Sequence, residues 1–165
     1  MNDLLHNLIE ALREELKQYG EMLAVLEQQQ QSVVQRQTTT LLQNVADVNA
    51  QTNVIAAVRH EREQHRRNVA RRLGLEDNAG FAVIIPLLPS DYRPLVQALV
   101  QENNSLLLRI QHRARQNQLL LSHCVELMQQ LINSILPGAS PRTYDNSGRL
   151  PVNHLPQRSI YEQVG

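Results

Sequence analysis

Apolar residues recur along this chain at alternating steps of four and three residues, which is the spacing of a coiled-coil seam. The pattern occurs in three runs, which span 5–26, 41–55 and 99–131. The seam positions are Leu5, Ile9, Leu12, Leu16, Tyr19, Leu23 and Leu26; Leu41, Val45, Val48, Thr52 and Ile55; and Leu99, Asn103, Leu106, Ile110, Arg113, Asn117, Leu120, Cys124, Leu127 and Leu131. Long helices packed along such seams leave little room for a catalytic cavity. We therefore expect a protein that binds something and does not convert it.

The order of the runs and breaks predicts an all-α fold, in which a long antiparallel helical hairpin packs with a third long helix. We expect helices at about 2–35, 39–73 and 91–136 and a connector at 74–90, whose apolar run 81–85 covers the end of the hairpin or forms a partner patch. Gly74 suits a left-handed helix end, while Pro137 and Gly138 stop the third helix. Residues 1–136 would form the bundle, and 137–165 an irregular, flexible tail with apolar anchor points.

The distribution of charge supports the hairpin. Residues 1–27 carry a net charge of −4, and residues 59–72 carry +4. In an antiparallel pair these two blocks lie side by side, because the start of one helix meets the end of the other. Exposed ion pairs are weak, so we expect the charges to select orientation more than to stabilise the fold.

Composition excludes several classes of protein. The formal net charge is zero, which gives no overall attraction to nucleic acid or to an anionic membrane. No apolar run approaches the roughly 20 residues that span a bilayer. The single cysteine, Cys124, forms no internal disulfide, and the amino terminus lacks the basic start of a signal peptide. These features favour a cytoplasmic protein.

Motifs for chemistry are weak. His60 and His65 lie five residues apart, whereas the zinc-protease helix motif needs a spacing of four, so we expect no metal site there. The six arginines between Arg59 and Arg72 resemble a nucleic-acid surface, but acidic residues interrupt them and no aromatic residue accompanies them. The sequence carries no catalytic constellation and no cofactor fingerprint. We therefore predict no enzyme, no cofactor, no metal and no nucleic-acid partner.

Three polar residues, Asn103, Arg113 and Asn117, occupy seam positions of the third helix where leucine would be more stabilising. Such residues can fix the register of a helix pair at some cost in stability. They can equally mark a face that is only reversibly buried. Both interpretations stay open at this point.

Two short motifs resemble the FlgN family of flagellar export chaperones. The first is Arg115-Gln116-Asn117-Gln118-Leu119-Leu120, and the second, beyond the third helix, is Thr143-Tyr144-Asp145-Asn146-Ser147-Gly148-Arg149. The order of helices, connector and tail matches over essentially the whole chain. The resemblance implies a cytosolic chaperone of type III flagellar export. Its clients would be the hook-associated proteins of the hook-filament junction, kept unassembled and delivered to the export gate.

On this hypothesis the end of the third helix and the tail hold the amphipathic terminal helix of the client. The client-binding residues would be Leu120, Leu127, Leu131, Leu150, Leu155 and Ile160. Tyr144, in the tail motif, would be an aromatic anchor for docking at the export gate. The alternative is a structural coiled-coil scaffold or tether, a homodimer without an export client.

Overall fold

The computed structural model describes residues 1–135, apart from the side chain of Thr38. These residues form α1 (Asn2–Val34), α2 (Thr38–Arg72), α3 (Phe81–Ile84), the 3-10 turn η1 (Ile85–Leu87) and α4 (Arg93–Ile135), and they include no strand. The bounds of α1 and α2 and the start of α4 lie within two residues of the predicted ones, and the predicted end of the third helix at about 136 lies outside the described residues. The chain divides into two compact units, Met1–Cys124 and Val125–Gly165. Of the second unit, the structure describes residues 125–135, the last turns of α4.

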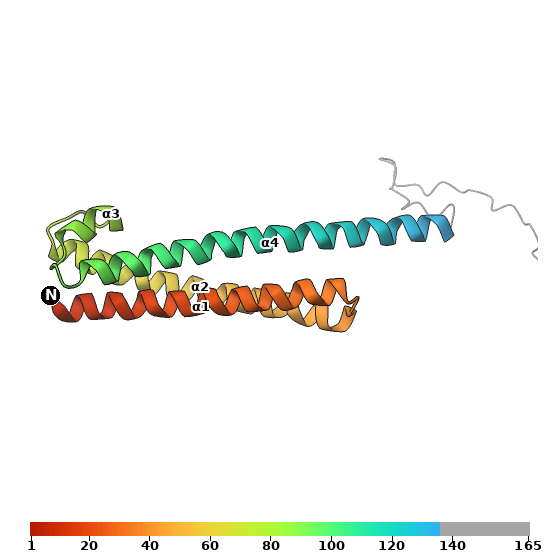
Figure 1. The fold of residues 1–165 in the computed structure, drawn as a ribbon, viewed down its shortest axis with the longest axis horizontal. Coiled ribbons are helices and arrows are strands. Elements are labelled where there is room, and N and C mark those ends of the chain that lie inside the picture. Colours follow the sequence, from red (N-terminus) through yellow and green to blue (C-terminus); the bar gives the residue numbers. More distant parts are fainter. Residues whose placement is uncertain (136–165) are drawn as a thin grey trace, which may run out of the picture. The chain divides into compact units, whose positions relative to one another are not determined.

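Helices α1 and α2 form the predicted antiparallel hairpin and approach each other closely along their length (Figure 1). The turn between them places Arg36 at φ 57°, a left-handed conformation that is uncommon outside glycine. Helix α2 ends at Arg72, and Gly74 just beyond it has the predicted left-handed conformation, with φ 73°. There the Leu75 amide donates to the Ala70 carbonyl at 3.0 Å, and the Gly74 amide to the Arg71 carbonyl at 3.1 Å. This pair of bonds is the Schellman pattern that satisfies the last carbonyls of a helix.

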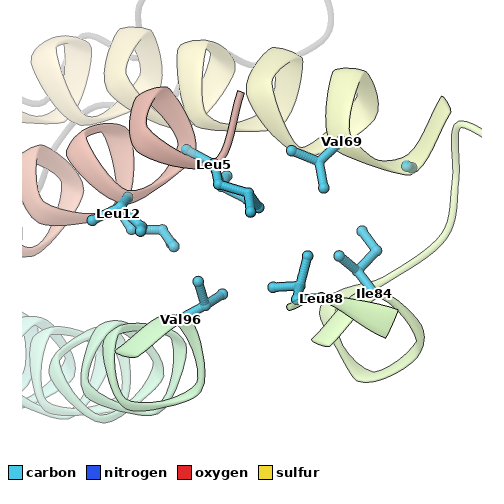
Figure 2. Close-up of a cluster of buried hydrophobic side chains, with 9 residues drawn as sticks. Leu5, Leu12, Val69, Ile84, Leu88 and Val96 are labelled. Atoms are coloured by element: carbon cyan, nitrogen blue, oxygen red, sulfur yellow. The ribbon is translucent and has the colours of Figure 1, made fainter. Parts of the chain in front are cut away.

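The hydrophobic core lies where the start of α1 and the end of α2 meet the connector and the start of α4. Leu5 and Leu12 of α1, Val69 of α2 and Val96 of α4 are buried there (Figure 2). The connector adds Ile84 and Leu88, both fully buried. These side chains cover the end of the hairpin, as the sequence predicted for the connector, although its Val83 and Leu87 stay exposed.

The predicted seam of α2 is wrong at alternate positions. Val45 and Thr52 are exposed, and Asn44 and Gln51 point toward α1 in their place. The Asn44 amide donates to the Ser32 hydroxyl at 2.8 Å, and the Gln51 amide to Gln18 Oε1 at 2.7 Å. The middle of the hairpin therefore contacts through hydrogen-bonded polar side chains, which a search for apolar periodicity does not detect.

Opposite charges pair across the hairpin as the sequence predicted. Glu15 of α1 is buried, and its Oε2 lies 3.2 Å from Nε of Arg62, with Arg59 Nε at 4.0 Å from the other oxygen. Glu15 also accepts a hydrogen bond from the Tyr19 hydroxyl at 2.8 Å. Burial, followed by that hydrogen bond, raises the pKa of Tyr19 to about 12. Tyr19 therefore stays protonated in the folded state to well above neutral pH.

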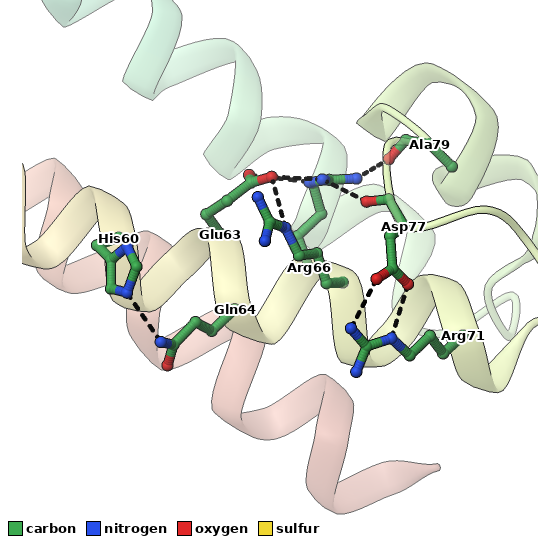
Figure 3. A network of polar contacts seen from close by, with 8 residues as sticks. His60, Glu63, Gln64, Arg66, Arg71, Asp77 and Ala79 are labelled. Carbon is green, nitrogen blue, oxygen red and sulfur yellow. Dashed lines mark hydrogen bonds and ion pairs between the residues drawn. The ribbon is translucent and has the colours of Figure 1, made fainter.

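Other arginines of α2 hold the connector in place (Figure 3). Arg66 is buried, bonds to Glu63 and to the Ala79 carbonyl, and donates to the Asp77 carbonyl at 2.8 Å. The hydrogen bond from Arg66 keeps the pKa of Glu63 below its ordinary value. Arg71 binds the Asp77 carboxylate with two bonds of 2.6 Å. Part of the arginine block is thus engaged within the fold.

Candidate functional site

Helix α4 runs parallel to α1 over residues 93–124 and is fastened to it by two asparagines. Nδ2 of Asn103 donates to the Leu12 carbonyl at 3.0 Å, and Nδ2 of Asn117 donates to the Leu26 carbonyl at 2.7 Å. Both pairs join residues 91 positions apart in the sequence, so the two helices keep one register across the two heptads between the asparagines. Asn103 is 5% exposed and Asn117 is 1% exposed. The burial and hydrogen bonds of these two seam residues agree with the register interpretation.

Arg113, the third polar seam residue, lies at the edge of the same contact. Its guanidinium bonds to Gln30 and lies 3.9 Å from Glu27. Asn117 also donates to Gln29 Oε1 at 2.9 Å. The contact between α1 and α4 is therefore more polar than a leucine seam.

The end of α4 carries apolar side chains that are open to solvent. All residues from 125 to 135 are exposed. Leu127 is 65% exposed and Leu131 is 59% exposed, although Leu131 continues the heptad position of Asn103 and Asn117, and Leu127 continues the other seam position, that of Arg113 and Leu120. We call these two leucines, together with three further exposed side chains, the α4 apolar face; the set is Leu127, Met128, Leu131, Ile132 and Ile135. At 100° per residue these five residues fall on one side of the helix.

The predicted client-binding residues have different positions in the structure. Leu120 is half-buried in the first unit, while Leu127 and Leu131 belong to the α4 apolar face. Leu150, Leu155 and Ile160, as well as Tyr144, lie outside the described residues. The sequence analysis omitted Met128, Ile132 and Ile135. A heptad count selects only the seam residue in each turn, whereas a wider apolar stripe also includes a neighbouring residue of that turn. An i, i+1, i+4, i+5 pattern of apolar residues was the signal that could have identified them.

An exposed apolar stripe on a helix suits contact with another apolar helix and offers no means of chemistry. Cys124, earlier in α4, is half-buried, although its seam position predicted a buried residue. Within 1–135 no group of three or more acidic, histidine or cysteine side chains could hold a metal ion. His60 pairs with Gln64, and His65 lies 3.8 Å from Glu61. Fold and face together define a helical binding protein.

A comparison with protein families shows which family of helical binding proteins this chain belongs to. The model of the FlgN protein family matches residues 1–151, which is most of the chain. This protein belongs to the FlgN family and is therefore a flagellar export chaperone. The family is one of chaperones and not of enzymes. Searches of curated proteins and of solved structures gave no match. In the part of the chain that the structure describes, no helix has the length and apolar character to cross a membrane.

Proposed function

We propose that this protein is a cytoplasmic chaperone for hook-associated proteins of the hook-filament junction. It binds their amphipathic terminal helices, prevents premature assembly and delivers them to the export gate. The observation that carries the proposal is the α4 apolar face, since family membership alone does not name the client. Two leucines of this face are about three-fifths exposed, although earlier turns of the same helix pack against α1. A group of exposed apolar side chains of this kind is typical of a binding surface for a partner.

The chemistry of the face fits such a client. An unassembled amphipathic helix buries its apolar stripe by lying along another apolar helix, in the helix-in-groove mode. Burying one leucine side chain contributes about 1.5–3 kcal/mol. A face of five such residues is sufficient for reversible binding after the cost of association is subtracted, which suits a chaperone that must release its client.

The test replaces leucines of the face and measures the dissociation constant of the terminal segments of hook-filament junction proteins by fluorescence anisotropy. Leu127→Glu together with Leu131→Glu should weaken binding at least about 100-fold, because two leucines contribute about 3 kcal/mol or more and 1.4 kcal/mol is tenfold. The matched control is Ser122→Glu with Gln130→Glu, which adds the same charge at exposed positions on the other side of α4. Equal affinities for the two double variants would contradict the proposal.

The same proposal includes the tail, which supplies the client-binding residues Leu150, Leu155 and Ile160. Removing residues 137–165 should abolish client binding and leave helicity nearly unchanged, which circular dichroism measures. Tyr144→Ala should spare client binding and weaken docking to the export gate. If Tyr144→Ala lost both activities together, separate roles for the tail residues would be wrong.

Light scattering on the eluate of a sizing column addresses the scaffold alternative. A defined complex of chain and client supports the chaperone proposal. A homodimer that binds none of the junction proteins would instead favour a structural tether.

A further inference from the structure

A cleft of about 490 Å³ lies in the first unit, between α2 and α4 and over α1. It is far in sequence from the α4 apolar face and shares no residue with it. Its lining includes Leu12 of α1, Arg59 and Arg62 of α2, Phe81 of α3, and Val100 and Leu107 of α4. Helices α2 and α4 both pack against α1 here, and the space between them corresponds to the position of the fourth helix in a four-helix bundle.

The cleft contains a buried acceptor without a donor. Asn103 lines it, and while Nδ2 of Asn103 bonds to the Leu12 carbonyl, its Oδ1 is buried without a hydrogen-bond partner among residues 1–135. Leaving such an oxygen unpaired costs about 1–3 kcal/mol. A ligand that brings an N–H group to this oxygen recovers that cost. Nε of Arg62, in the same lining, is likewise buried without a hydrogen-bond partner among the described residues, so the site favours an occupant that offers both a donor and an acceptor.

The cleft also carries an excess of positive charge. Within residues 1–135, Arg59 and Arg62 share a single carboxylate, that of Glu15, which in addition accepts a hydrogen bond from the Tyr19 hydroxyl. The guanidinium of Arg62 is held over the Phe81 ring, 5.9 Å from its centroid. Arg59 is 51% exposed and reaches Glu15 only at 4.0 Å, so it is available to a second carboxylate.

We propose that this cleft is a second binding site, which takes the amino-terminal turns of an acidic amphipathic helix from a partner protein. The first turn of a helix has backbone N–H groups without partners, and acidic side chains are favoured there by the helix dipole. One such N–H group bonds Oδ1 of Asn103, and a carboxylate pairs with Arg59. An apolar side chain of the same turns packs against Val100 and Leu107.

The test uses the full-length chain with labelled methyl groups and a synthetic amphipathic peptide about 14 residues long, roughly four helical turns. The peptide carries glutamates in its first turn and leucines along one side; a second peptide has glutamine at each glutamate. On titration with the acidic peptide, the methyl resonances of Val100, Leu107 and Ile85 should shift, and the glutamine peptide should bind about tenfold or more weakly. Shifts confined to Leu127 and Leu131, or equal affinity for the two peptides, would overturn the proposal.

Variants at exposed positions keep the test free of folding defects. Arg59→Glu should weaken the acidic peptide by about tenfold or more, because it replaces attraction with repulsion. Arg72→Glu makes the same charge change on α2 at an exposed position outside the cleft and should leave affinity unchanged. Gln101→Trp on the α4 wall should block the cleft, whereas Gln118→Trp, exposed on the same helix outside the cleft, should not. Loss of binding in both members of a pair, or in neither, would contradict the site.

Discussion

The hydrogen bonds of Asn117 predict that Asn117→Asp undocks α4 from the hairpin. The change keeps the size of the side chain and replaces a donor group with an oxygen. Nδ2 now donates to the Leu26 carbonyl at 2.7 Å and to Gln29 Oε1 at 2.9 Å, in a place where the side chain is almost wholly buried. An aspartate there would set a negative charge against two acceptors, while Arg113, one turn earlier on α4, is already engaged by Gln30 and Glu27.

The magnitude follows from those contacts. Each hydrogen bond lost contributes about 1 kcal/mol, and a charge buried without a partner adds a penalty, so we expect a total loss of roughly 3–5 kcal/mol in the free energy of docking α4. Burial raises the pKa of the introduced carboxyl group, and the protonated form can donate one hydrogen bond. The loss relative to the wild-type chain should therefore shrink as the pH falls from about 7 to about 4.

Two measurements follow the effect. Urea unfolding followed by circular dichroism gives the change in stability, and the reaction rate of Cys124 with a thiol reagent reports the docking of α4, because this half-buried cysteine is the single thiol of the chain. The control is Asn104→Asp, one position from Asn103 and exposed, which should change stability by less than about 0.5 kcal/mol. If Asn117→Asp behaved like this control, the asparagine contacts would not hold α4 in place.

Two further predictions concern the hairpin. Because burial raises the pKa of Tyr19 from 10.0 to about 12, the unfolded chain loses this proton first, and stability should fall as pH rises from about 10 toward 12, by about 1.4 kcal/mol per unit. Tyr19→Phe should lack this slope in urea unfolding curves, and an equal slope in that variant would contradict the assignment. Arg36→Gly should raise the melting temperature, since relief of the left-handed conformation at φ 57° contributes up to about 1 kcal/mol. Arg13→Gly, inside α1, should lower it by a similar free energy, and a fall in both variants would refute the strain at Arg36.

The sequence predicts some parts of this fold better than others, for physical reasons. The seam of α1 was predictable because its residues are apolar and also buried, as Leu5, Leu12 and Leu26 are. The seam of α2 is not, since Asn44 and Gln51 point toward α1 as hydrogen-bonded amides that apolar periodicity passes over. The hairpin itself was predictable from the charge distribution as well as from apolar periodicity. The arginines near the end of α2 pair with Glu15 near the start of α1, which is the pairing that an antiparallel arrangement of the two helices produces.

The candidate site shows the same division. Heptad counting identified Leu127 and Leu131 and predicted them to be seam residues, but the periodicity is the same whether a face is covered or open. Only the structure distinguishes these exposed leucines from the buried positions earlier in α4. The cleft between α2 and α4 was not predictable, because its side chains come from separate helices and no motif in the sequence links them.

The separation of 91 positions between the residues that join α1 and α4 also has a consequence for the order of folding. The α1–α2 hairpin closes through a short turn, so its contacts are local and should form early, whereas α4 must close a long loop before any of its contacts form. Contacts that form late and are few also open first in the native state. Hydrogen exchange should therefore find α4 less protected than the hairpin, which would give the chaperone a helix that leaves and returns without unfolding the rest.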